Sequence, residues 1–166
     1  MKQFLLGVVA TLVVLFAGGL AYLLLGFAEV RGDQPVTGME RPVMRAAVHA
    51  SVRRHAPNDS DPVPPTDANL IAGGREYLNQ CAGCHGEPGR ERRFAAPLNP
   101  DAPQLPTEGT DYTESQIFWV AKHGIRRTGM CSNGVDSVLG PIATFIRHIK
   151  DLPPAVRDSL AAPTKR

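Results

Sequence analysis

The distribution of apolar residues sets the first part of the chain apart from the rest. Residues 4–28 (FLLGVVATLVVLFAGGLAYLLLGFA) contain no charge, and a helix of that length extends about 37 Å, enough to cross a bilayer. A signal peptide also begins with a basic residue such as Lys2, but its apolar core usually has only about 7–15 residues. We therefore predict a transmembrane anchor in residues 1–30, with a cleaved signal peptide as the alternative.

Prolines interrupt the next part, residues 31–65, which we interpret as a connector and not as a core. Residues 42–55 (PVMRAAVHASVRRH) have the proline near the start and the basic residues at the end that suit a short helix. We expect this helix to be a solvated or membrane-surface spacer. Docking through Arg45, Arg53 and Arg54 to a partner or to anionic lipid is the alternative.

Apolar residues recur at helical spacing in residues 66–163, which have the size of one small domain. A first helix is predicted to begin at Thr66 or Asp67, both of which suit an N-cap. In a later segment we expect the regular helix to begin at Pro141, because proline is tolerated in a first turn. Their apolar stripes, which should pack on each other, comprise Leu70, Ile71, Gly74, Tyr77, Leu78 and Cys81, and Val138, Leu139, Ile142, Phe145, Ile146 and Ile149.

A further helix is predicted between these two, since residues 113–116 (TESQ) form a capping-box pattern and Gly124 ends the segment. Residues 86–110 contain five prolines and no periodicity, which makes this stretch long for an idle loop. The apolar residues are too few to stabilise such a domain alone, so a bulky apolar ligand is expected at its centre. The predicted fold is all-α, with three main helices and long loops.

Composition narrows the functional classes. A chain of 166 residues is too short for a multidomain enzyme, and 18 Lys and Arg against 16 Asp and Glu leave no basic excess for binding nucleic acid. Three cysteines are too few for a disulfide scaffold. These residues are therefore candidates for chemistry.

Two of the cysteines lie in residues 81–85, Cys-Ala-Gly-Cys-His, the pattern of covalent haem attachment. The thiols of Cys81 and Cys84 would add to the two haem vinyl groups, and the adjacent His85 would ligate the iron. A thioredoxin-like dithiol would open a helix between strands, whereas this pair ends an amphipathic helix. A zinc site would need four ligands, and Cys131 is the one remaining cysteine. The pattern favours haem.

A second axial ligand would come from a methionine or histidine elsewhere in the chain. Met130 lies in a loop between two predicted helices, 45 residues after His85, which is enough chain to cross a porphyrin face. Met130 is therefore the preferred candidate. The others lie in the connector or in predicted helices: Met39, Met44, His49, His55, His123 and His148.

The motifs GGREYLNQCAGCHG, PLNPDAPQL and IFWVAKHGIRRTGM, with a closing helix that ends in DLPP, resemble the membrane-anchored monohaem class I cytochromes c of bacteria. The resemblance covers residues 66–154. It implies a cytochrome c fold around one covalently bound haem c in residues 66–163, after an N-terminal transmembrane helix. It also implies that Gly73 and Tyr77 lie where the first and last helices cross, that Pro97 lends its carbonyl to the ring N–H of His85, and that Met130 is the axial ligand.

Two positions depart from the family pattern. Cys131 follows Met130 where relatives commonly have proline, and Gly140-Pro141 interrupts what is commonly an unbroken closing helix. A thiolate beside the ligand could compete for the iron. We expect Cys131 instead to be a partly buried, unreactive thiol.

The resemblance also implies a place and a role. Haem is attached to such motifs outside the bacterial cytoplasm, so we expect a single-pass protein of the inner membrane with a periplasmic domain, although Arg31, Arg41 and Arg45 run against the positive-inside rule. The expected role is electron transfer and not enzymatic catalysis. Expected partners are a quinol-oxidising complex or dehydrogenase as donor and a terminal oxidase or reductase as acceptor. A haem-based sensor or small-ligand binder with a labile sixth site is the alternative.

Overall fold

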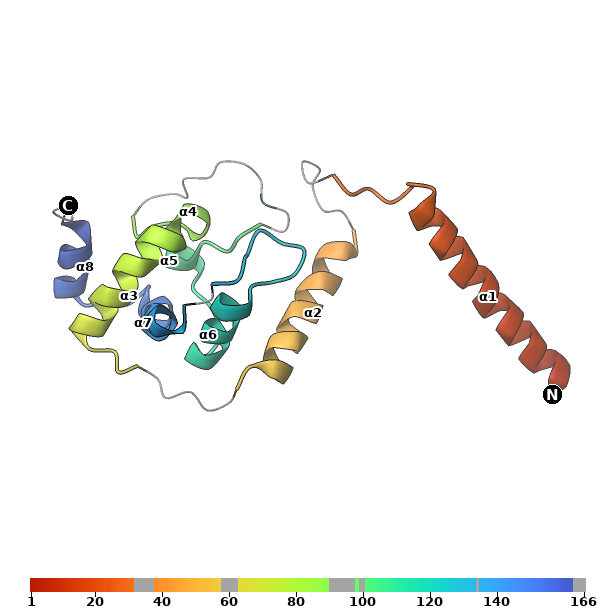
Figure 1. The fold of residues 1–166 in the computed structure, drawn as a ribbon, viewed down its shortest axis with the longest axis horizontal. Helices are drawn as coiled ribbons and strands as arrows, with labels where there is room; N and C mark the ends of the chain where they lie inside the picture. Colours follow the sequence, from red (N-terminus) through yellow and green to blue (C-terminus); the bar gives the residue numbers. More distant parts are fainter. Residues whose placement is uncertain (32–37, 58–62, 90–97, 99–100, 134, 163–166) are drawn as a thin grey trace. The chain divides into compact units, whose positions relative to one another are not determined.

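The structure, a computed structural model, describes residues 1–31, 38–57, 63–89, 98, 101–133 and 135–162. These residues form helices and no strand, which confirms the all-α prediction for the described part of the chain (Figure 1). The chain divides into two compact units, residues 1–34 and residues 35–166. The helices are α1 (Lys2–Leu24), α2 (Glu40–His55), α3 (Asp67–Gln80), α4 (Ala82–His85), α5 (Leu105–Glu108), α6 (Glu114–His123), α7 (Asp136–His148) and α8 (Pro154–Ala161).

The first unit consists mainly of α1, which ends at Leu24, four residues before the end of the apolar run. Its mean hydropathy reaches 2.5, and none of its residues is buried within the protein. A helix of this length and composition fits a membrane anchor or a signal sequence, the two alternatives that its sequence predicts.

In the second unit, α3 crosses α7 at very close range. Thr66 caps α3, since its Oγ1 accepts a hydrogen bond from the Asn69 amide, and this confirms one of the two predicted caps. At Gly73 a Cβ atom would lie 2.0 Å from the Pro141 carbonyl oxygen, so the backbones touch there. The Tyr77 and Phe145 rings meet at a centroid distance of 5.3 Å. The predicted crossing at Gly73 and Tyr77 is therefore confirmed.

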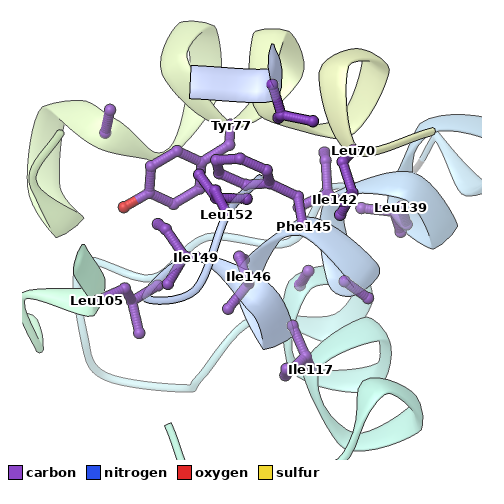
Figure 2. Close-up of a cluster of buried hydrophobic side chains, with 14 residues drawn as sticks. Leu70, Tyr77, Leu105, Ile117, Leu139, Ile142, Phe145, Ile146, Ile149 and Leu152 are labelled. Atoms are coloured by element: carbon purple, nitrogen blue, oxygen red, sulfur yellow. The ribbon is translucent and has the colours of Figure 1, made fainter. Parts of the chain in front are cut away.

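The apolar core lies mainly between α3, α6 and α7 (Figure 2). Helix α6 carries the predicted capping box, in which the side chains of Thr113 and Gln116 each accept a hydrogen bond from the other's backbone amide, and it ends before Gly124 as expected. Besides Tyr77 and Phe145, the fully buried core side chains include Leu70, Leu139 and Ile142.

The prediction for the start of α7 was wrong. The helix begins at Asp136, five residues before Pro141, which lies inside it. Proline costs helix stability there because it lacks an N–H group, but the early start places Leu139 in the core with no exposed surface. Burial of that side chain therefore outweighs the local preference.

Helix α8 was not predicted, because Pro153 and Pro154 were interpreted only as the end of the closing helix. Pro153 is the N-cap of α8 and Pro154 occupies its first position, where proline is favoured. The helix packs against α3: Val156 is fully buried, and Leu160 lies where a Cβ atom on Gly74 would have to be.

Helix α2, expected to be a solvated or membrane-surface spacer, is mostly exposed but also packs against the rest of its unit. Val52 is only 1% exposed, and Ala56 just after the helix is also buried. The His49 ring lies 5.1 Å from that of Tyr112, and the His55 ring is stacked on Trp119 of α6 at 6.3 Å. The second unit therefore includes a helix that the sequence assigned to the connector.

Candidate functional site

The Cys81–His85 motif forms a single helical turn at the end of α3. Cys81 is both the C-cap of α3 and the N-cap of α4, and its carbonyl accepts hydrogen bonds from the amides of Cys84 and His85 at 3.1 and 3.0 Å. The two thiols are free and half-buried. The turn thus carries two unpaired thiols and an imidazole.

The imidazole of His85 is held through one nitrogen. Its Nδ1 lies 3.0 Å from the carbonyl oxygen of Pro103. With Nδ1–H as the donor, Nε2 keeps its lone pair for a metal ion. Burial lowers the pKa of His85, while the hydrogen bond to Pro103 acts in the opposite direction. The ring is therefore favoured in its neutral, ligating form.

The structure brings Pro103 to His85, in the role that the family resemblance gave to Pro97. Pro97 lies outside the described residues. Both prolines belong to the segment PLNPDAPQL, and nothing in its local pattern separates them. The distinguishing feature is tertiary: two residues after Pro103, the Leu105 side chain enters the core, which anchors this end of the loop.

Two further side chains bind the carbonyls of this turn. The buried hydroxyl of Tyr77 donates to the Gly86 carbonyl at 2.7 Å and lies 3.3 Å from that of His85. The side-chain amide of Gln104 donates to the Cys84 carbonyl at 3.2 Å. Burial raises the pKa of Tyr77 well above its usual value, so the phenol remains a donor at any physiological pH. Sequence reasoning missed Gln104, which carries no recognisable signal.

Met130 is half-buried at the end of a closed loop. The Ile125 amide donates to the Met130 carbonyl at 2.9 Å, and the Thr128 hydroxyl accepts from the Met130 amide at 3.0 Å while it donates to the Ile125 carbonyl at 2.8 Å. Arg127 adopts a φ of 62°, in the left-handed region. These contacts fix the backbone of the loop that carries Met130 between α6 and α7.

The segment after Met130 is joined to the Cys81 turn. Asn133 donates from its side chain to the Gln80 side chain, next to Cys81, and its backbone amide bonds to the Ala121 carbonyl. Burial raises the pKa of the Cys81 thiol to about 11, and the thiols of Cys84 and Cys131 act in the same direction. The hydrogen bond between Asn133 and Gln80 therefore links the segment after Met130 to the start of the Cys81 turn. Cys131 is exposed, so the expected partial burial is wrong.

The remaining ligand candidates lie elsewhere. Met39 and Met44 are exposed at the start of α2, His49 contacts Tyr112, and His148 bonds through Nδ1 to the Thr144 carbonyl at 2.9 Å. His55 and His123 flank Trp119. The four histidines thus have contacts within the protein, and the two methionines are exposed.

The donor set fits a covalently attached haem. Cys81 and Cys84 are free thiols on one turn, His85 has one nitrogen engaged and the other available, and Met130 offers a thioether from an ordered loop. Among the residues that the structure describes, no three His, Cys, Asp or Glu side chains are grouped in the manner of a metal-ion cluster.

Part of the chain matches a known protein family. Residues 68–146 match the model of the family described as cytochrome c oxidase, cbb3-type, subunit III. The range runs from the first turn of α3 to near the end of α7, and includes the Cys81–His85 turn and Met130. No curated protein and no solved structure matches the chain significantly.

Proposed function

We propose that this chain, whose residues 68–146 form a class I c-type cytochrome domain, is a membrane-tethered carrier of single electrons. One haem c would be attached through thioether bonds to Cys81 and Cys84, with His85 and Met130 as ligands of its iron. The observation that carries the proposal is the helical turn with two free thiols and a histidine whose Nδ1 is already bound to a carbonyl.

Bound haem supplies an iron that alternates between its ferric and ferrous states, at a relatively high potential when a methionine is one ligand. With His85 and Met130 both engaged, no coordination position remains for a substrate. This is the basis for proposing an electron carrier and not an enzyme.

The residues around the turn would keep the ligands in place during electron transfer. Pro103 orients the imidazole of His85, and such outer hydrogen bonds fix a ligand and raise its basicity. Tyr77 holds the last carbonyls of the turn, and the hydrogen bonds of Thr128 hold the Met130 loop. A site held on both sides needs little rearrangement when the charge of the iron changes.

Membrane tethering is supported by α1, which we propose to be a retained anchor of the inner membrane with the domain on the periplasmic side. A tether raises the effective concentration of the domain near other membrane proteins. The matched family is named for a subunit of a terminal oxidase, which supports partners of the respiratory chain. We propose a quinol-oxidising complex or dehydrogenase as donor and a terminal oxidase or reductase as acceptor.

The test of ligation is an absorption spectrum of the purified full-length protein, oxidised and reduced, before and after denaturing extraction of loose haem. We expect haem that resists extraction and the red charge-transfer band of sulfur-ligated ferric iron. That band should disappear in Met130→Ala and persist in Met44→Ala, a matched control at an exposed methionine of α2.

The other outcomes point elsewhere. Covalent haem without the band, together with rapid binding of carbon monoxide to the reduced protein, would contradict the carrier and favour a sensor with a labile sixth site. If the protein carries no haem after expression with a haem-attachment system, the result would favour a redox dithiol or a zinc site at Cys81 and Cys84. Detection of the intact N-terminus in the membrane fraction tests the anchor, and cleavage near residue 28 would overturn it.

A further inference from the structure

The side chain of Gln104 bridges two segments on either side of the His85–Pro103 contact. Its Nε2 group donates to the Cys84 carbonyl at 3.2 Å and to the Ala102 carbonyl at 3.1 Å. Cys84 directly precedes His85, and Ala102 directly precedes Pro103. One amide group thus connects the neighbours of both partners in that contact.

The backbone of Gln104 is itself well anchored. Gln104 is the N-cap of α5, and its carbonyl accepts hydrogen bonds from the amides of Thr107 and Glu108 at 3.1 and 2.8 Å and from the Thr107 hydroxyl at 3.1 Å. Leu105, the next residue, is buried in the core. The bridge therefore runs from a fixed helix end to the turn that carries His85.

The packing around this bridge is tight. Gly86 has a φ of 82°, and a Cβ atom there would lie 2.8 Å from Oε1 of Gln104. The side-chain amide of Gln104 is consequently confined between the Gly86 backbone and the two carbonyls that it binds. Pro103, by contrast, is exposed and has no N–H group of its own with which to hold its segment.

We propose that Gln104 is a positioning residue that holds the Pro103 carbonyl against the Nδ1–H group of His85 and thereby lowers the reduction potential of the haem. The inference rests on the proposed function, in which His85 ligates the iron. A hydrogen bond from Nδ1–H to a carbonyl raises the basicity of the ligating nitrogen. A more basic ligand stabilises the ferric state, and this lowers the potential.

The test compares Gln104→Met with wild type in the full-length protein carrying haem. Methionine retains the length of the side chain but cannot donate a hydrogen bond. We expect solvent exchange of the His85 Nδ1 proton, measured by NMR in the ferrous protein, to accelerate about tenfold or more. We also expect the potential to rise in a redox titration, with the Met130 charge-transfer band retained.

Gln116→Met is the matched control. It removes a glutamine that also makes side-chain hydrogen bonds, but in the capping box of α6. This variant should leave both the exchange rate of the His85 proton and the potential unchanged. Equal changes in the two glutamine variants would reduce Gln104 to a general structural role.

Unchanged proton exchange and an unchanged potential in Gln104→Met, with normal haem content, would overturn the proposal. If that variant does not take up haem, the shorter Gln104→Asn replaces it, with the same expected direction and the same opposing result. Failure of the proposed function is visible separately, because wild type would then lack haem or the charge-transfer band.

Discussion

The contact between α3 and α7 is much more deeply buried than the contact between α2 and α6. Between α3 and α7 the backbones touch at Gly73, and Tyr77 and Phe145 have no exposed surface. On the α2 side, one side chain within the helix, Val52, is buried, the His55 ring stacks on Trp119 of α6, and the His49 ring meets that of Tyr112, just before α6, in a tilted arrangement. Most of the remaining α2 residues are exposed.

The two contacts therefore differ in what they support: the first holds the haem site, and the second only attaches α2. The contact between α3 and α7 fixes the end of α3, from which the Cys81–His85 turn continues, so any change there should reach the haem site. Helix α2 lies outside the matched range and outside that turn. We expect its detachment to leave the haem site intact.

The largest effect is expected at the deep contact, from Gly73→Val. Its side chain would overlap the Pro141 carbonyl, which is backbone and cannot move aside, so the helices must separate at a cost above about 3 kcal/mol. We expect loss of haem incorporation and a much lower thermal midpoint by circular dichroism. Ala72→Val, at an exposed neighbour, is the control and should retain haem incorporation and the thermal midpoint. Normal haem content in Gly73→Val would contradict the dependence of the haem site on the contact between α3 and α7.

Tyr77→Phe should have the next largest effect. It keeps the ring in the core but leaves the Gly86 carbonyl without its donor, at a cost of about 1–3 kcal/mol. We expect lower stability in guanidinium unfolding together with a spectral change at the haem. Tyr112→Phe, on the α2 side, should lower stability less and leave the spectrum unchanged. Equal spectral effects of the two variants would argue against the distinction.

Val52→Ala tests the shallow contact. The loss of two methyl groups should weaken the contact between α2 and α6 by about 1.5 kcal/mol. We expect faster hydrogen exchange at the α2 amides, with the haem spectrum and the exchange of α3 unchanged. Val43→Ala, on an exposed part of α2, should alter none of these. Slower electron uptake with a perturbed haem spectrum in Val52→Ala would show that α2 belongs to the site.

The smallest effect concerns the thiols of the haem-free protein. Burial raises the pKa of Cys81 to about 11, so at pH 8 this group is a neutral thiol and a poor nucleophile. Exposed Cys131 should therefore be alkylated by iodoacetamide before Cys81, as followed by mass spectrometry of the peptides. The difference in alkylation rate between Cys131 and Cys81 should narrow as the pH rises toward 11, because the thiolate of Cys81 then forms. Faster labelling of Cys81 at pH 8 would contradict its burial.

Local signals predicted much of this structure. The cap at Thr66, the capping box at Thr113 and Gln116 and the stop at Gly124 depend on hydrogen bonds within a few residues, and all are present. The glycine at position 73 allowed the helix crossing to be inferred from the resemblance. In short-range patterns of this kind, the groups that form the hydrogen bonds lie within a few residues of each other, so the sequence alone is enough to recognise them.

The errors fall where distant contacts decide. The start of α7 is set by burial of Leu139 despite Pro141, and α2 buries Val52 and contacts α6 through His55 and Trp119. The sequence of α2 is largely polar and does not indicate that the helix packs against α6, because only one of its side chains, Val52, is buried. Helix α8 was overlooked because the two prolines that begin it can equally end a helix.

The sequence by itself determined the chemistry of this protein: the Cys81–His85 motif, the candidate ligand Met130 and the apolar helix α1 are all properties of residue type and spacing. Only the tertiary structure decided how that chemistry is held. Pro103 and Gln104 reach His85 and Cys84 across 18 and 20 residues of chain. Hydrogen bonds between such distant segments form only after the core has brought α4 and α5 together, and no local pattern records them.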